Sequence, residues 1–126
     1  MKRLIAALIL LGLIIGICCI GNRTVTDIHA KTYKILDECE KAILSQNKAK
    51  ALSAARSAVS YWKKRRLLLC AFVNHSRYTE TEICLVKICK LISGNTLSEA
   101  LPECAEAKVI LKEIYSEQRF KLENIL

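Results

Sequence analysis

An uncharged, apolar run of 17 residues near the N-terminus, from Leu4 to Ile20, restricts the fold of this chain more than any other feature. With the α-helical rise of about 1.5 Å per residue, the run is about 25 Å long and just spans the hydrocarbon core of a bilayer. Residues 4–21 are therefore predicted to form a transmembrane anchor. The remaining residues, 22–126, suffice for one domain with a single core.

Lys2 and Arg3 precede the apolar run, so residues 1–3 have the composition of a basic cytoplasmic segment. The positive-inside tendency places the N-terminus in the cytoplasm and the domain on the extracytoplasmic side, although basic residues on the far flank weaken this bias. A cleaved secretory signal is the alternative, because a basic start, an apolar stretch and small residues also suit a signal peptidase. The run is longer than the apolar part of a usual signal, which favours a single-pass protein of the cell membrane.

Gly12 and Gly16 lie four residues apart within the apolar run. This small-residue spacing lets two transmembrane helices approach closely, and it predicts contact between two copies of the chain. Glycine is also common in membrane helices generally, so the motif has a second explanation that needs no partner.

Residues that punctuate the backbone are scarce after the anchor. Gly94 and Pro102 are the only glycine and proline between residues 22 and 126, whereas a sheet protein needs many more turn residues. Apolar residues recur there at steps of three and four, which is the period of one face of an α-helix. The expected fold class is all-α: an N-terminal transmembrane helix followed by an antiparallel bundle of about four helices.

Capping residues set the expected boundaries of the first three bundle helices. The first helix covers residues 24–44, and Asn47 is a suitable N-cap for the second. Thr79 and Glu82 have the spacing of a capping box that opens the third helix, unless the interruption at residues 74–78 is a kink. The apolar stripe expected on the second helix is Ala49, Leu52, Ala55, Val59, Trp62, Leu69 and Val73.

The loop before the last helix has the clearest signals. Gly94 is expected in the left-handed conformation, and Thr96 with Glu99 has the spacing of a capping box. A loop this short makes the third and fourth helices antiparallel neighbours. The apolar residues of the tail, 120–126, are expected to pack on the bundle. The stripe expected on the fourth helix is Leu101, Cys104, Val109, Leu111, Ile114 and Tyr115.

Five of the seven cysteines lie in the domain, namely Cys39, Cys70, Cys84, Cys89 and Cys104. They include no C-x-x-C pair, and His29 and His75 are far in sequence from any cysteine pair, so a zinc site is not expected. Free cysteine is among the most buried residue types, and these thiols are predicted to be small apolar core residues. No metal and no cofactor is expected.

The densest charge run is Lys63, Lys64, Arg65 and Arg66. Such a block can bind anionic lipid, wall polymer or nucleic acid. On a helix, however, four consecutive residues at steps of about 100° surround most of the circumference and cannot form one flat patch. One of the two arginines must then lie near the apolar stripe, with a paired guanidinium or a stem along the core edge. A solvated or structurally paired run is the alternative to a binding site.

His75 follows Phe72 in the interruption between the second and third expected helices. A titratable ring near a carboxylate such as Glu80 could act there in acid–base chemistry. The chain has no nucleophile-elbow, zinc-protease or phosphate-loop motif that would complete a catalytic set. Capping or hydrogen bonding at a helix end is the alternative role of His75, and no enzymatic activity is expected.

The order of residues along the domain carries a likeness to a known family. The likeness rests on Trp62, Leu68, Phe72, His75, Glu80, Glu82 and Ile83, and on the closing residues Leu122, Glu123, Asn124, Ile125 and Leu126. In this order the chain resembles the domain-of-unknown-function family 4363, short single-span membrane proteins of anaerobic, spore-forming Gram-positive bacteria. The resemblance implies an N-terminal span and an all-helical remainder, and it implies no activity. The chain departs from the pattern at Arg77, where an acidic residue is usual, and at Glu113, where histidine is usual.

The net charge of +8 includes Lys2 and Arg3, and the rest of the chain carries 18 basic against 12 acidic side chains. This excess favours anionic surroundings such as lipid headgroups or wall polymers, and nucleic acid is not an expected partner outside the membrane. The predicted function is a non-enzymatic, membrane-anchored helical interaction module of the bacterial cell envelope. Its expected partners are the membrane and another envelope protein or a second copy. The alternative is a domain that binds or senses an anionic ligand, lipid or wall polymer through residues 63–66 and His75.

Overall fold

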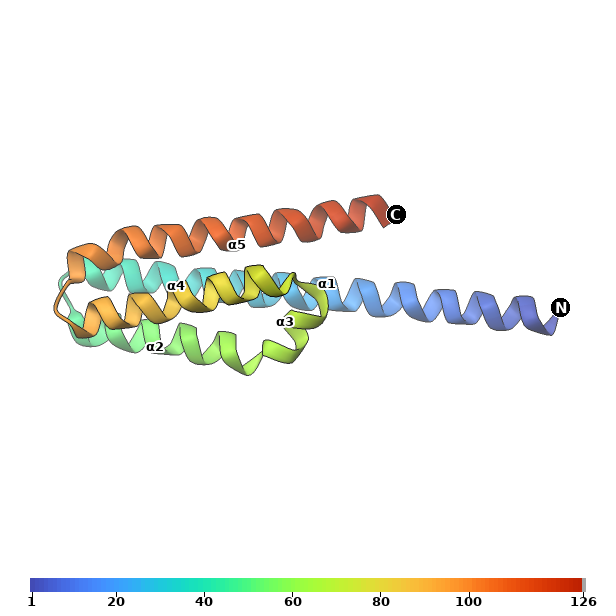
Figure 1. Cartoon of the computed structure of the whole chain (residues 1–126), viewed down its shortest axis with the longest axis horizontal. Coiled ribbons are helices and arrows are strands. Elements are labelled where there is room, and N and C mark those ends of the chain that lie inside the picture. The colour runs from blue at the N-terminus through green and yellow to red at the C-terminus, as the bar shows by residue number, and fades with distance from the viewer. Residues whose placement is uncertain (126) are drawn as a thin grey trace.

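The computed structural model of the chain describes residues 1–125, apart from the side chains of Leu122 and Ile125, and these residues form five α-helices without a strand. The helices are α1 (Lys2–Leu44), α2 (Lys48–Lys64), α3 (Arg66–Phe72), α4 (His75–Ser93) and α5 (Leu97–Ile125), shown in Figure 1. The predicted all-α fold is confirmed. Leu126, the last residue of the family pattern, lies outside the described residues.

The apolar run and the first bundle helix belong to one helix. α1 runs without interruption through Gly21, where the anchor was predicted to end, and continues to Leu44. Polar side chains after the run fit this helix because the hydroxyls of Thr24 and Thr26 donate to carbonyls four residues earlier, at 2.8 and 2.9 Å. The apolar run and the bundle are therefore joined by helical backbone and not by a loop.

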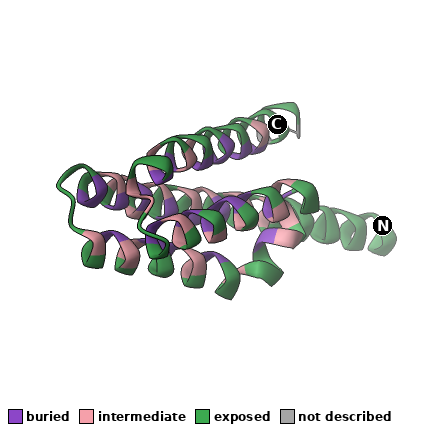
Figure 2. Cartoon of the chain, turned by 60° about the vertical axis from the view of Figure 1, so that its left-hand side comes forward, coloured by how far each residue is buried: buried purple, intermediate pink, exposed green. Residues whose placement is uncertain are grey.

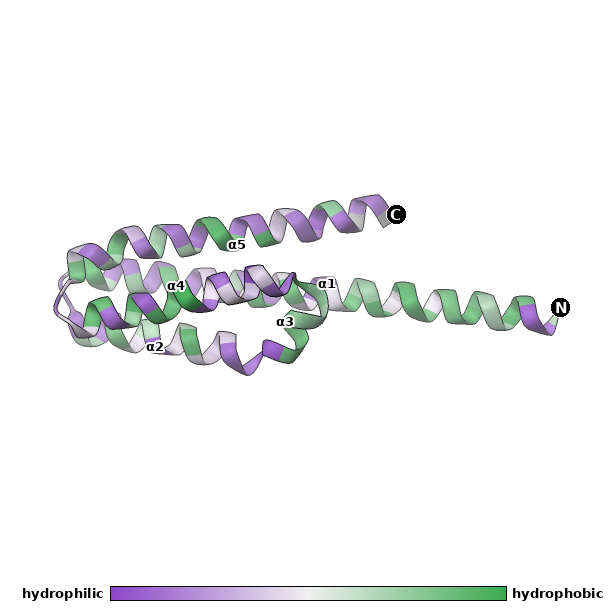
Figure 3. Cartoon of the chain, viewed as in Figure 1, coloured by the Kyte–Doolittle hydropathy of each residue, from purple (hydrophilic) through white to green (hydrophobic). Residues whose placement is uncertain are grey.

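The N-terminal part of α1 projects from the bundle as an isolated, largely hydrophobic stretch of helix (Figure 3), and its large apolar side chains are exposed. It is long and apolar enough to cross a membrane. A signal sequence near an N-terminus also meets these criteria of length and composition. None of the large apolar residues from Leu4 to Ile15 contributes to the core. The apolar run is thus separate from the hydrophobic interior of the domain.

Four helices close the bundle, with α1 packed against α2 and α5, and α4 packed against the same two helices. Neighbours along the chain run antiparallel because the connecting loops are short (Figure 1). Each helix turns one buried face inward, as Figure 2 shows. The largest fully buried side chains are Trp62, Tyr78, Leu36, Leu69, Leu85, Ile88, Ile92, Leu111 and Ile114.

The buried face of α2 differs from the predicted stripe. Ala51, Ala55 and Ala58 are the buried residues that precede Trp62. The predicted positions Ala49, Leu52 and Val59 are exposed or half-buried. The alanines face inward because their small side chains let α2 lie close to α1, where the thiol of Cys39 reaches the carbonyl of Ala51 at 3.5 Å. The prediction was right for Ala55 but placed Leu52 and Val59 on this face instead of Ala51 and Ala58.

A similar rotation affects α5. Ala107 and Ile110 are buried between Cys104 and Ile114, whereas the predicted positions Val109 and Tyr115 are 54% and 40% exposed. Phe120 is 64% exposed, so the expectation that the tail packs on the bundle is wrong for its aromatic residue. The described side chain of Asn124 is also exposed.

The loops before α2 and α5 allow two of the predicted helix boundaries to be compared with the structure. Asn47 caps α2 as predicted, since its side chain accepts from the backbone N–H of Lys50 at 3.2 Å. In the loop before α5, however, Gly94 has φ −83° and Asn95 has φ 62°. The predicted left-handed glycine is wrong by one position, because asparagine tolerates this conformation better than most residues.

The segment between α2 and α4 also differs from prediction. The second helix does not continue through the charge run, because α2 ends at Lys64 and the separate helix α3 follows. The side chain of Asn74 accepts from the backbone N–H of Ser76 at 2.9 Å and caps α4. Thr79 therefore lies inside α4, and the predicted capping box there is wrong. An asparagine cap five residues earlier starts the helix in time to bury Tyr78.

Candidate functional site

The helix break after α2 divides the basic run. Arg65 occupies the break, where its guanidinium lies 3.7 Å from the centroid of the Tyr61 ring and donates to the Tyr61 carbonyl at 3.3 Å. This matches the expectation that one arginine would be structurally paired. Lys63 lies 3.8 Å from Glu82, and Lys64 and Arg66 are exposed on different helices. The four residues are thus divided by a helix break, and the predicted spread around one continuous helix does not apply.

Lys63 and Lys64 instead line a groove between α2 and α4, which we call the basic groove. A hollow of about 520 Å³ between the helices is lined by residues of both, and an adjoining hollow of about 440 Å³, lined by α4 alone, shares Val86 with it. Val59, Val86 and Cys89 supply apolar surface between the helices, and Ile83 extends it while remaining 61% exposed. The residues that line the groove are Arg56, Val59, Ser60, Lys63, Lys64, Glu82, Ile83, Val86, Lys87, Cys89 and Lys90.

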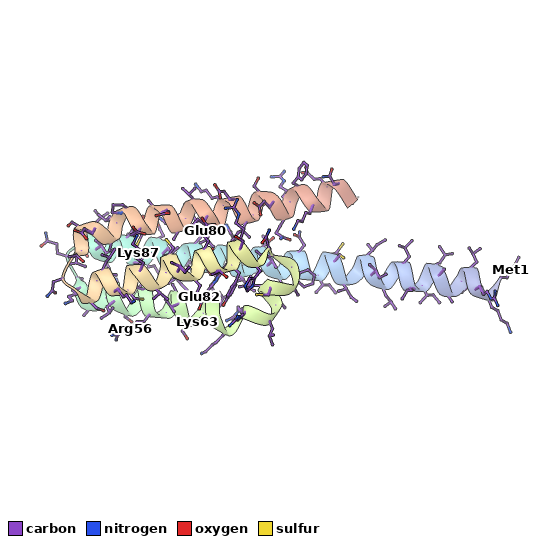
Figure 4. The ribbon with its side chains drawn as sticks, viewed as in Figure 1. Met1, Arg56, Lys63, Glu80, Glu82 and Lys87 are labelled. Carbon is purple, nitrogen blue, oxygen red and sulfur yellow. The ribbon has the colours of Figure 1, made fainter. Side chains whose placement is uncertain are left out.

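The basic groove carries its cations on α2, and its extension over α4 carries two more. Its five basic side chains, Arg56, Lys63 and Lys64 on α2 and Lys87 and Lys90 on α4, face one acidic residue, Glu82. Figure 4 shows Arg56 and Lys63 on one helix and Lys87 on the other. Three of the five have no ion pair with any described residue: Arg56, Lys64 and Lys90. The groove therefore combines an apolar floor with cations that are free to meet a negative ligand.

His75 is the first residue of α4 and is exposed. Its Nδ1 atom lies 3.8 Å from the Cys70 sulfur, and no described carboxylate pairs with the ring. Glu80, the carboxylate considered as its catalytic partner, is instead held by Arg77 at 3.2 Å. His75 does not line the basic groove, so the structure does not join it to Lys63 and Lys64.

A charge cluster that the sequence did not reveal joins α4 to α5. The guanidinium of Arg77 lies 3.2 Å from Glu80, 2.9 Å from Glu113 and 3.1 Å from Glu117. Its hydrogen bonds to Glu117 and then Glu80 raise the pKa of Arg77 above the usual range. Arg77 and Glu113 are both departures from the family pattern, and here they form a pair. The four-residue spacing of Glu113 and Glu117 on one helix face was the available signal.

His29 lies in a pocket of about 470 Å³ between α1 and α5. Its ring centroid is 5.5 Å from that of Tyr115 and 6.5 Å from that of Tyr33, and its Nε2 atom is buried without a partner among the described residues. Burial lowers the pKa of His29, and a hydrogen bond with the Leu111 backbone acts in the opposite direction without reversing this. The ring therefore favours its neutral form in the folded state.

This environment predicts loss of stability in mild acid. Because the pKa of His29 is lowered from 6.5 on folding, the unfolded chain binds the proton more tightly. The contribution of His29 is thus fully present above pH 6.5 and declines as the pH falls through its folded-state pKa. Urea unfolding at a series of pH values measures this dependence. His29→Phe should be less sensitive to acid between pH 6.5 and the carboxylate range, and an unchanged pH profile in this variant would contradict the assignment.

Three potential metal ligands come together on α4 and α5. The Cys84 sulfur and carboxylate oxygens of Glu103 and Glu106 lie within 4.8 Å of one another. Burial, followed by the charges of Glu106 and Glu103, raises the pKa of Cys84 to about 12, and Lys87 binds Glu103 at 2.9 Å. A metal ion would have to displace both the thiol proton and this lysine. Cys84 is therefore better described as a thiol packed in the core, as the sequence predicted, than as a metal ligand.

All seven cysteines are free thiols, and their burial predicts an order of alkylation. Cys39, Cys84 and Cys104 are buried, while Cys70 is half-buried beside His75. A pKa of about 12 instead of 9.0 leaves the Cys84 thiol about 1000-fold less ionised at neutral pH. Iodoacetamide should therefore modify Cys70 well before the three buried thiols in the folded chain, as followed by peptide mass mapping. In urea the preference should vanish; equal rates in the folded chain would show that the core is not packed as described.

Comparison with known proteins places most of the chain in one group. A family model described as "Domain of unknown function (DUF4363)" matches residues 19–125. No curated protein and no solved structure matches the chain. The matched range begins near the end of the apolar run and includes the basic groove, the Arg77 cluster and the His29 pocket.

Proposed function

The chain belongs to the DUF4363 family, and we propose that it is a non-enzymatic, membrane-anchored helical module of the cell envelope that binds a protein partner. The partner segment is an acidic, amphipathic helix, and its binding site is the basic groove. The observation that carries this proposal is the apolar floor of the groove, formed by Val59, Val86 and Cys89, beside the cations of α2 and next to the α4 extension with Lys90.

Membrane attachment is supported by the N-terminal part of α1. Its apolar side chains are exposed and serve no packing role within the bundle. Transfer of such a surface from water into lipid is strongly favourable. Lys2 and Arg3 favour a cytoplasmic N-terminus. A retained anchor is preferred to a cleaved signal because α1 continues as an unbroken helix through residue 21. Cleavage there would divide this helix.

The form of the groove favours a helical peptide. Val59, Val86 and Cys89 offer apolar contacts, which an amphipathic helix meets with residues at three- and four-residue spacing. Acidic residues on both edges of such a helix would face Arg56 and Lys64 on one wall and Lys90 on the other. Complementary charge of this kind accelerates association and selects the partner.

An anionic polymer or lipid is the second candidate ligand, favoured by the exposed Lys64 and Arg66. A purely polar polymer would leave the apolar floor uncovered, and Arg65 is already occupied by Tyr61. Contact between two copies through Gly12 and Gly16 is a further proposal. A side chain at either glycine would meet nothing within 4 Å, so both positions are open to a neighbouring helix.

Photocrosslinking in membranes of the native host tests the proposed partner. A benzophenone side chain replaces Ser60 in the basic groove, and the matched control replaces Ser98, an exposed serine on α5. Position 60 should yield a protein adduct whose cross-linked peptide carries acidic and apolar residues at helical spacing. Adducts to lipid or polymer alone, or equal protein adducts from both positions, would contradict the proposal.

A charge-matched pair of variants tests the electrostatic part. Arg56→Gln combined with Lys64→Gln removes two unpaired cations from the groove. Lys34→Gln combined with Lys121→Gln removes the same charge from exposed positions elsewhere. The first pair should reduce the adduct at position 60, and the second should not. Because exposed charges are screened by salt, the adduct should also weaken as ionic strength rises.

A further inference from the structure

The short helix α3 lies at the end of the bundle from which the apolar part of α1 projects (Figure 1). Its last residue, Phe72, packs against Gly21, the first residue after the apolar run. The contact is so close that a Cβ atom on Gly21 would overlap the Phe72 ring. The position of α3 is thus tied to the point where the apolar run ends.

The outer face of α3 is unusually apolar for a water-exposed helix. Leu67 is 90% exposed and Leu68 is 37% exposed, whereas Leu69 is buried. Apart from Met1, no large apolar side chain in the described part of the chain is more exposed than Leu67, including those of the apolar run. Water is therefore a poor environment for this face.

Positive charge surrounds this apolar face. Lys64, Arg65 and Arg66 directly precede Leu67, and no acidic residue occurs anywhere from position 48 to position 79. Basic residues next to exposed leucines are typical of segments that lie in the headgroup layer of anionic bilayers.

The end of α5 reaches the same level. The side-chain amide of Gln118 donates to the Phe72 carbonyl at 2.7 Å, which fixes α5 beside the end of α3. Beyond this contact, Arg119 is exposed and Phe120 is 64% exposed. An aromatic and a basic side chain therefore accompany α3 at the end of the bundle nearest the apolar run.

The length of the apolar run sets the depth of this surface. A helix of 17 residues spans about 25 Å, which is less than the hydrocarbon core of about 30 Å. A short span draws its flanking residues into the bilayer, so Gly21 should lie within the headgroup layer, which is about 5–7 Å thick on each side. Phe72 is held at the same level, and α3 is about 10 Å long.

We propose that α3 is a second membrane contact, in which Leu67 and Leu68 enter the headgroup layer of the same bilayer that the anchor crosses. Arg66 then faces lipid phosphates, and Phe120 contributes from α5. The inference rests on the proposed membrane anchoring. It assigns α3 the role of holding the bundle upright on the membrane, with the basic groove along its side.

Fluorescence quenching by brominated lipids tests this contact in the full chain, reconstituted in vesicles of phosphatidylglycerol and phosphatidylethanolamine. Leu67→Trp and Phe120→Trp place probes at the proposed contact. Val109→Trp is the matched control, because Val109 is an exposed apolar residue farther along the bundle. Leu11→Trp reports on the anchor itself. The buried Trp62 is a common background that the parent chain measures.

Probes at positions 67 and 120 should lose fluorescence most strongly with lipids brominated near the headgroup end of the acyl chain. The probe at position 11 should respond to bromine near the methyl end, and the probe at position 109 should respond to neither. Quenching at position 11 without quenching at 67 would overturn the α3 contact and leave the anchor intact. No quenching at position 11 would overturn the membrane anchoring itself. Burial of position 67 without lipid quenching, in a cross-linked second copy, would also overturn the proposal.

Discussion

Trp62→Ala is expected to lower the free energy of unfolding of the bundle by about 3–5 kcal/mol, the usual cost of removing a large aromatic side chain from a core. Trp62 is 1% exposed and stacks on Tyr78, with 5.7 Å between ring centroids. Its indole N–H donates to the Tyr78 carbonyl at 3.3 Å. The variant therefore loses buried surface, a ring contact and a hydrogen bond between α2 and α4.

Urea unfolding of the full chain in detergent micelles, followed by far-ultraviolet circular dichroism, measures this loss. Trp62→Phe is the matched control, because it keeps a ring beside Tyr78 and removes the hydrogen bond, which is worth about 1 kcal/mol. The phenylalanine variant should fall between the parent and the alanine variant. A loss below about 1 kcal/mol for Trp62→Ala would show that Trp62 is not packed in the core.

Gly21→Leu is expected to destabilise the bundle by about 1–3 kcal/mol, as overpacking of a filled site generally does. The new side chain would occupy the space of the Phe72 ring and displace α3 from α1. Because Gln118 donates to the Phe72 carbonyl, displacement of α3 would also disturb its contact with α5. The same urea unfolding assay measures the effect.

Gly16→Leu provides the control for Gly21→Leu. Both substitutions replace a glycine of α1 and gain about 1 kcal/mol of helix propensity, but a side chain at Gly16 meets no atom within 4 Å. The difference between the two variants isolates the collision with Phe72. Phe72→Ala should partly rescue Gly21→Leu, because it vacates the space that leucine needs. Equal stability of the two leucine variants would refute the close packing of α3 on α1.

Several features of the fold could be predicted because they depend on neighbours along the chain. The three- and four-residue spacing of apolar side chains predicted helices, and the scarcity of glycine and proline excluded a sheet. Asn47 was identified as an N-cap because its side chain bonds a backbone N–H three residues later. Trp62 was assigned to the core because of its size and its place on an apolar face.

Other features escaped prediction because they depend on contacts between helices. Ala51 and Ala58 are buried because α2 lies close to α1, and no local signal ranks alanine above the nearby Leu52. The helix break at Arg65 accompanies the stacking of its guanidinium on Tyr61. A periodic pattern that continues across such a break gives no sign of it.

The candidate site shows the same division. Helical geometry predicted that Lys63, Lys64, Arg65 and Arg66 could not share one face of a continuous helix, but a helix break at Arg65 divides the run between α2 and α3. The basic groove was not foreseen, because its walls come from residues 56–64 and 82–90 on two different helices. Likewise Arg77 meets Glu113 and Glu117 across the interface between α4 and α5.

The capacity of residues 4–20 to enter a membrane follows from sequence alone, because it depends on the length and side-chain chemistry of one continuous segment. Helix type and the Asn47 cap follow for the same reason, since their hydrogen bonds close within a few residues. Packing between segments distant in sequence places α3 beside Gly21 and α2 beside α4. Such contacts depend on the shapes of both segments. The basic groove and the exposed apolar face of α3 could therefore be identified only from the tertiary structure.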